Sequence, residues 1–411
     1  MLKLDKIVLF IYVSFALDSL LKINAGVQLH LGIIAILLTN ALVLLKKPYL
    51  AISPLTKNYM FVLFVLYCAI NGFSYNHQGY AGLLVYLFIV CNLIIFCSYT
   101  VSHINKRALV YFQLVMIVTG LLQYGLFKFF GYQISFIDAE HYQKGSSVSH
   151  RLRGFFVEPN WFAIAFTFNT VLLIGTNIER FCRQMPWLTG LTIIVIVLNG
   201  TLATLGALLI IYSVPYVKKS PLKGMFIIAV LAAILVATFS FREGIKLDQA
   251  GASAAYGNTQ VLNHSSRVEP IIRVLDFQSR QDFTQVFFGH GLGSWATIAV
   301  PNQLSVLVFV PKPGVRDGSE IPVILFELGI LGALILILDL IITFIKCPAR
   351  NYHYRGALIL FFICLALYPT LKFWMYMPYY FYIRAFIYQN QKNSNVNNYS
   401  ELKDEHKKEL L

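Results

Sequence analysis

Long apolar segments recur along nearly the whole chain, and short polar segments rich in lysine and arginine separate them. A helix needs about 20 apolar residues to cross a bilayer, because each residue adds about 1.5 Å and the hydrocarbon layer is about 30 Å thick. A soluble fold built from these segments would expose a large apolar surface to water. The pattern therefore predicts an all-α polytopic membrane protein.

About twelve segments are expected to cross the membrane. Two of them, separated only by Gly200 and Thr201, are expected to form a tight hairpin of short helices. The predicted spans are Ile7–Leu21, Val27–Leu45, Tyr59–Phe73, Gly82–Tyr99, Ala108–Phe130, Pro159–Thr176, Trp187–Asn199, Leu202–Val217, Gly224–Phe241, Ile321–Ile345, Ala357–Pro369 and Leu371–Tyr388.

The basic residues predict how these spans are oriented. Most lysines and arginines of the short loops fall on one side, together with both ends of the chain. Short cytoplasmic loops are enriched in Lys and Arg, so this side is predicted to be the cytoplasm. Residues 1–389 would form the integral membrane domain, with two long periplasmic loops at about 131–158 and 242–320. The polar tail 390–411 is expected to be disordered and cytoplasmic.

The net charge of +14 does not indicate nucleic-acid binding, because the basic residues lie in short loops between apolar segments. The six cysteines show no CxxC spacing, and the outward histidines show no metal-ligand spacing. We therefore expect no disulfide framework, no metal and no cofactor. Membrane lipid is an expected partner.

The first long loop ends in Arg151-Leu-Arg-Gly-Phe-Phe-Val-Glu-Pro-Asn160, directly before a predicted span. Pro159 suits the first turn of a helix, whose free N–H groups and positive dipole end favour an anion. Together with Arg151 and Arg153, this turn could bind a phosphate, while Glu158 and Asn160 could hold a sugar hydroxyl. The alternative is that the arginines are interfacial anchors and that Glu158 caps the helix.

The second long loop contains Arg267, Arg273 and Arg280. Positions 273 and 280 are seven residues apart, so on a helix they share one face. A cationic surface near the bilayer could hold a diphosphate. Alternatively, each arginine is a solvated charge paired with a neighbouring carboxylate, namely Glu269, Asp276 or Asp282.

A glycine-rich run, Phe288-Gly-His-Gly-Leu-Gly-Ser294, follows these arginines. Gly289, Gly291 and Gly293 would allow the backbone to approach a ligand closely, or they form a flexible turn. His290 could be a base or a hydrogen-bond donor, and its alternative role is structural.

Few charges lie inside the predicted spans. Asp18, Asp339 and Glu327 are functional candidates because charge inside a membrane is costly. Lys372 and Arg384 lie near the ends of a short span, where we expect them to reach the interface.

At these residues the chain resembles the O-antigen polymerase and ligase superfamily, the Wzy/WaaL type. Three motifs carry the resemblance, in the same order along the chain. They are Arg153-Gly-Phe-Phe-Val-Glu-Pro-Asn160 at the start of a span, Ser265-Ser-Arg267 followed by Gly289-His-Gly-Leu-Gly293, and Glu327-Leu-Gly-Ile-Leu-Gly332.

The chain departs from the family pattern at two places. The family often has His-Asn about nine residues before the glutamate of the third motif, where this chain has Gly318 and Ser319. The ligases are expected to depend on that histidine, so its absence favours polymerase over ligase. The family also often has Ser-Arg where this chain has Leu198-Asn-Gly-Thr-Leu202, so one cationic contact is missing or comes from elsewhere.

The resemblance implies a GT-C-like membrane glycosyltransferase of the bacterial inner membrane, with its active site facing the periplasm. It would move a growing glycan from undecaprenyl diphosphate to the next undecaprenyl-diphosphate-linked repeat unit, and a polysaccharide chain-length regulator would be a partner. Arg153, Arg267 and Arg273, supported by Arg151 and Arg280, would stabilise the leaving diphosphate, and Glu158 or His290 would act as base. The alternatives are an O-antigen ligase and a flippase for the lipid-linked oligosaccharide.

Overall fold

The structure of the chain is a computed structural model. It describes residues 4–24, 28–75, 80–132, 134, 151–156, 158–220, 269–304, 319–348, 351–367 and 378–389, and isolated positions between 222 and 238. The predicted span Gly224–Phe241 lies partly outside these ranges, and Arg267, Lys372 and the tail 390–411 lie wholly outside them.

Helices dominate the described residues, and most of them coincide with a predicted span. In chain order the elements are α1 (Leu4–Ser14), η1 (Phe15–Leu17), β1 (Lys22–Asn24), β2 (Gln28–His30), α2 (Leu31–Lys46), α3 (Tyr49–Lys57), α4 (Tyr59–Tyr75), α5 (Tyr80–Thr100), η2 (Val101–His103), α6 (Lys106–Phe130), α7 (Pro159–Ile174), α8 (Ile178–Gln184), α9 (Pro186–Asn199), α10 (Leu202–Lys219), α12 (Glu269–Gln278), α13 (Phe283–Phe288), η4 (Trp295–Ala299), α14 (Glu320–Lys346) and α15 (Tyr352–Leu367). Residues 378–389 are also helical.

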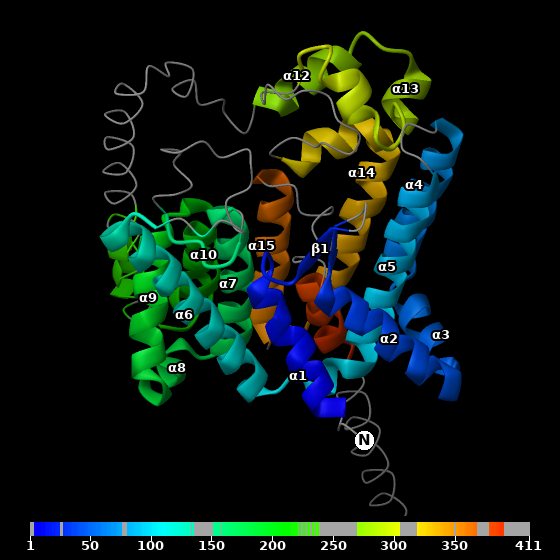
Figure 1. The fold of residues 1–411 in the computed structure, drawn as a ribbon. Helices are drawn as coiled ribbons and strands as arrows, with labels where there is room; N and C mark the ends of the chain where they lie inside the picture. The colour runs from blue at the N-terminus through cyan, green and yellow to red at the C-terminus, as the bar shows by residue number, and fades with distance from the viewer. Residues whose placement is uncertain are drawn as a thin grey trace, which may run out of the picture.

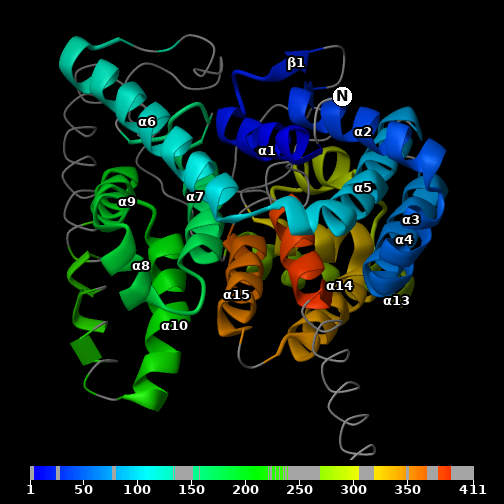
Figure 2. The same ribbon diagram turned by 90° about the horizontal axis from the view of Figure 1, so that it is seen from below.

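The helices form two groups joined through α15. One group contains α6 to α10 and the other contains α2 to α5 with α14, as Figures 1 and 2 show from two directions. Helix α15 packs against α7 and α10 on one side and against α14 on the other. The short helices α12 and α13 lie over one end of α14 (Figure 1).

Two described helices, α6 and α14, are long and apolar enough to cross a membrane. Up to four crossings result if each bent pair is one span: α2 with α3, bent by 117°, and α7 with α8, bent by 92°. The helical, apolar character that the sequence predicts is confirmed. The total of about twelve spans stays a prediction.

The chain between the first two predicted spans forms strands. Lys22–Asn24 pairs antiparallel with Gln28–His30, with Lys22 opposite His30. Helix α1 ends at Ser14, and one 3₁₀ turn follows it. The predicted bounds Ile7–Leu21 and Val27–Leu45 were therefore wrong at the ends facing this hairpin. Short apolar segments beside a turn are compatible with a helix or with a strand, so hydrophobic periodicity alone did not distinguish the hairpin from the ends of two helices.

Hydrogen bonds between buried polar side chains tie α1, α6, α7 and α9 together. The Tyr12 hydroxyl donates to Asn169 Oδ1 over 2.9 Å, and Asn169 Nδ2 donates to Gln113 Oε1 over 2.7 Å. Gln113 Nε2 in turn donates to the hydroxyls of Thr170 and Thr192. Between helices that expose apolar faces to lipid, such bonds add specific attraction that the hydrophobic effect does not supply.

A buried ion pair fixes the last described helix, and it corrects one expectation. Arg384 does not reach the interface, because its side chain is 2% exposed and pairs with Asp339, which is 1% exposed. The Tyr380 hydroxyl donates to Asp339 Oδ2 over 2.5 Å, and Arg384 Nε donates to Asn58 Oδ1 over 2.6 Å. The pair thus joins residues 378–389 to α14 and to the start of α4.

Arg384→Ala should destabilise the protein strongly, because it leaves the Asp339 carboxylate buried without its cation. Removing one partner of a buried pair costs about 3–5 kcal/mol. Thermal unfolding of the full-length protein in detergent measures the loss. Lys57→Ala, an exposed lysine next to Asn58, is the control and should change stability by less than about 0.5 kcal/mol. Equal losses in the two variants would show that the pair does not hold this helix.

Candidate functional site

The first candidate cluster is the arginine loop, which we define as residues 151–160. Helix α7 begins at Pro159, as predicted, and Glu158 takes the N-cap position without a side-chain bond to the helix. Arg151 lies across the loop: its Nε donates to Asn199 O over 2.7 Å and its NH2 donates to Thr201 Oγ1 over 2.6 Å. Asn160 Oδ1 lies 3.4 Å from the same NH2. The loop therefore brings Arg151 and Asn160 together, and the phosphate site stays a prediction.

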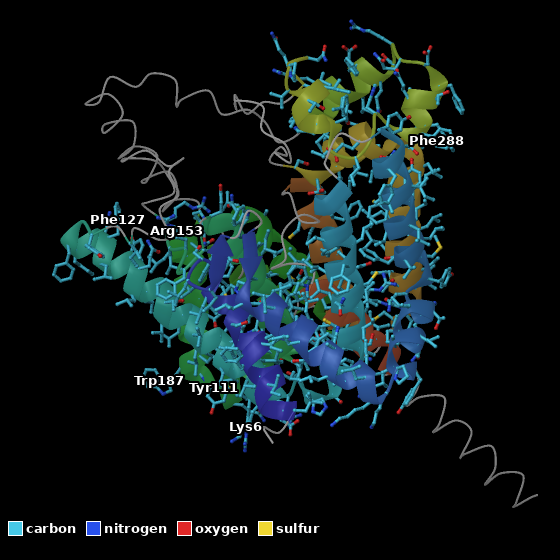
Figure 3. All side chains as sticks on the ribbon, turned by 45° about the vertical axis from the view of Figure 1, so that its right-hand side comes forward. Lys6, Tyr111, Phe127, Arg153, Trp187 and Phe288 are labelled. Carbon is cyan, nitrogen blue, oxygen red and sulfur yellow. The ribbon has the colours of Figure 1, made fainter. Side chains whose placement is uncertain are left out.

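Arg153 is the more enclosed of the two arginines, with 3% of its surface exposed. Its backbone N–H donates to Gln123 Oε1 on α6 over 3.0 Å. Gly154 follows with φ +54°, and a Cβ there would lie 3.1 Å from both Phe162 and Thr119. Arg153 is thus held inside the protein at the end of the helix bundle away from Lys6 (Figure 3), which does not fit a lipid-facing anchor.

Asn199 and Thr201, in the α9–α10 turn, complete the arginine loop. Asn199 Nδ2 donates to Leu152 O over 2.7 Å and to Pro159 O over 2.8 Å. The sequence had marked this turn only as a place where the family has an arginine. The structure instead places there a backbone carbonyl, Asn199 O, and a hydroxyl, Thr201 Oγ1, that accept from Arg151. The sequence signal for this turn was Gly200, whose φ is +69°.

Asn199→Ala should destabilise the arginine loop, because two buried carbonyls lose their donor. An unsatisfied buried polar group costs about 1–3 kcal/mol. The measurement is thermal unfolding of the full-length protein, with Asn302→Ala as control, since Asn302 is exposed and bonds only within its own turn. If the Asn199→Ala variant is as stable as the control, the Asn199 side chain does not stabilise the arginine loop.

The second candidate cluster is the cap, which we define as residues 269–304. Arg273 and Arg280 line one cavity of about 500 Å³. The predicted shared helical face is wrong, because α12 ends at Gln278 and Arg280 lies in the turn that follows it. Arg273 NH1 donates to Gln303 O over 2.7 Å, and Arg280, with a side chain 73% exposed, pairs with Asp276 at 2.8 Å. Asp276, Phe277, Gln281, Asn302, Gln303 and Leu304 complete the lining. Two guanidinium groups and several amides beside one carboxylate suit an anionic or sugar-bearing ligand.

The glycine run contacts another backbone segment at close range. Helix α14 breaks at Gly329 (φ +65°, ψ −169°). The carbonyls just before the break accept from the run: His290 N–H donates to Phe326 O over 2.9 Å, and Gly291 N–H donates to Glu327 O over 3.0 Å. A Cβ on Gly289 would lie 2.3 Å from Glu327 O. The close approach that the glycines predict is therefore to α14.

Two polar residues of α4 secure the same junction. The Tyr67 hydroxyl lies 2.8 Å from Phe288 O and 2.9 Å from Leu328 O. Asn71 donates to Phe288 O over 3.0 Å and accepts from Leu292 N–H over 2.6 Å. The sequence analysis did not single out this pair, although polar residues four apart in an apolar helix share one face and mark a contact.

His290 and Glu327 are both buried at this junction. The imidazole stacks on Phe326, with ring centroids 4.4 Å apart. Glu327 Oε1 accepts from Trp295 N–H over 3.1 Å, which anchors the short η4 helix. These contacts fit the structural alternative for His290 better than the role of base.

Gly289→Ala should loosen the cap, because the new Cβ meets a backbone carbonyl and φ is +83° there. Backbone strain and overpacking of this kind each lower stability by about 1–3 kcal/mol. Limited proteolysis of the full-length protein should cut the cap faster than in the parent. Gly190→Ala in α9, where a Cβ meets nothing within 4 Å, should not change the rate. An unchanged cleavage rate in Gly289→Ala would show that this contact does not hold the cap.

The predicted site residues fall into these two clusters. Arg151, Arg153, Glu158 and Asn160 belong to the arginine loop, and Arg273, Arg280, His290 and the three glycines belong to the cap. None of the hydrogen bonds given above joins one cluster to the other. Arg267 lies outside the described residues, so its predicted place beside Arg273 stays a prediction.

The described residues contain no group of three or more His, Cys, Asp or Glu side chains that could hold a metal. All six cysteines are free thiols, and burial raises the pKa of the Cys347 thiol to about 11, so it stays protonated at neutral pH. Compared with protein-family models and with curated proteins, the sequence gives no match.

Proposed function

We propose that this chain is an O-antigen polymerase, a multi-pass glycosyltransferase of the bacterial inner membrane. It would have about twelve spans in a GT-C-like arrangement, cytoplasmic termini and an active site facing the periplasm. Its substrate would be undecaprenyl-diphosphate-linked oligosaccharide, and a chain-length regulator would be a partner. The proposal rests on the motifs of the sequence and on one structural observation: a cavity lined by Arg273 and Arg280 beside apolar helices.

The proposed transfer reaction needs cationic side chains close to the diphosphate that leaves. The acceptor hydroxyl attacks the anomeric carbon of the donor glycan, and the bond from that carbon to the diphosphate oxygen breaks. Negative charge then develops on the undecaprenyl diphosphate, and guanidinium groups stabilise it through paired hydrogen bonds. Arg153 and Arg273 are the first candidates in the described residues, and Arg267 is the third by sequence.

Glu158 is the better candidate for the base that takes the proton of the acceptor hydroxyl. It is partly exposed at the N-cap of α7, beside Asn160. His290 is stacked on Phe326 in a buried junction, which limits its reach. Asn160 and Arg151 would position the sugar next to Glu158.

Arg273→Ala and Arg153→Ala should each lower the yield of polymer about 10- to 100-fold, because a hydrogen bond to a charged group contributes about 1.5–3 kcal/mol. The measurement is the length ladder of surface polysaccharide on a gel, in a strain deleted for this gene and complemented with each variant. Arg180→Ala is the matched control, since Arg180 is an exposed arginine on α8. It should restore the full ladder.

The deletion strain itself separates the candidate functions. A single repeat unit on the lipid A-core supports a polymerase. No repeat unit at all favours a ligase or a flippase, and the buried Asp339–Arg384 pair is the observation that keeps transport as a second candidate. A full ladder in both arginine variants, with each protein present in the membrane, would refute the site assignment.

A further inference from the structure

Helix α13 belongs to the second polar loop by sequence, yet three of its six residues are phenylalanine. Its six residues, Phe-Thr-Gln-Val-Phe-Phe, carry no charge. Phe283 is 76% exposed and Phe288 is 41% exposed, and the rings of Phe283 and Phe287 stack 5.5 Å apart. A patch of exposed aromatic rings on an outward loop needs an apolar or amphipathic partner.

Helix α14 also exposes apolar side chains, and these begin next to α13. Below the break, α14 exposes residues at helical spacing: Ile330, Leu334, Ile337, Leu338, Ile341 and Ile345. Above the break, its residues from 322 to 328 are mostly buried under the cap. The backbone of Phe287 contacts Gly329, one residue before this exposed face begins.

Helix α4 shows a second exposed face that ends at the same place. Its exposed residues are Leu63, Leu66, Ile70 and Phe73. On its other side, Tyr67 and Asn71 bond to Phe288 O, so α13 sits at the end of α4 (Figure 3). Helix α13 therefore contacts both α4 and α14, the two helices that carry these exposed apolar residues.

The length of α4 supports the same conclusion. Its 17 residues span about 25 Å, which is short of the roughly 30 Å of a hydrocarbon layer. An apolar element at the outer end of α4 would extend its apolar length toward the thickness of the hydrocarbon layer, so the bilayer would not need to become thinner there.

We propose that α13 is an interfacial helix, with Phe283 and Phe288 inserted into the outer edge of the bilayer and phospholipid as their partner. Short apolar faces of this kind bury their aromatic residues at the boundary between headgroups and acyl chains. The cap is then held to the membrane surface by lipid as well as by α14. The inference needs only the membrane location and does not depend on the transferase activity.

Photo-crosslinking tests it on the full-length protein in nanodiscs of phosphatidylethanolamine and phosphatidylglycerol. p-Benzoylphenylalanine replaces Phe283 or Phe288, both exposed, so that failure of one variant leaves the other. On irradiation the ketone inserts into an acyl C–H bond, and intact-mass spectrometry detects protein plus one phospholipid. Ser279, exposed in the same cap, is the matched negative position, and Ile337 on α14 is the positive one.

A phospholipid adduct at 283 and 288, as at 337, and none at 279 is the expected result. Positions 283 and 288 that stay unlabelled while 337 labels would overturn the proposal, as would adducts to another protein. If 337 also stays unlabelled, the lipid-facing assignment of α14 fails, and the proposal for α13 fails with it.

Discussion

Helix α14 breaks at Gly329, and the backbone groups that this break releases hold the cap to the rest of the protein. A continuous helix would use the Phe326 and Glu327 carbonyls within itself. At the break they accept from His290 and Gly291 instead, so both carbonyls stay hydrogen-bonded. Both partners in the closest contact are glycines, because any Cβ at Gly289 or Gly329 would collide with backbone.

Polar side chains inside the bundle follow the same requirement. Where the surroundings are apolar, a polar group stays only if another protein group satisfies it. Tyr12 with Asn169, and Asp339 with Arg384, join helices that are far apart in the chain. These contacts add specific hydrogen bonds and an ion pair to the apolar packing between the helices.

The two clusters use arginine in different settings. Arg151 is held across its loop by Asn199 and Thr201, whereas Arg273 and Arg280 line an open cavity. Under the proposed function, the enclosed and the accessible arginine sites would bind the charged diphosphate of a substrate whose lipid tail lies beside the apolar helices.

The sequence alone determined the helical, apolar character of the chain and the start of α7 at Pro159. These are local properties, because helix period and capping depend on residues within one or two turns. The tertiary structure alone decided that Arg151 meets Asn199, 48 residues away, that the glycine run meets α14, and that Arg384 pairs with Asp339. Periodicity fixes which face a residue lies on, but only the packing of distant segments decides what that face meets.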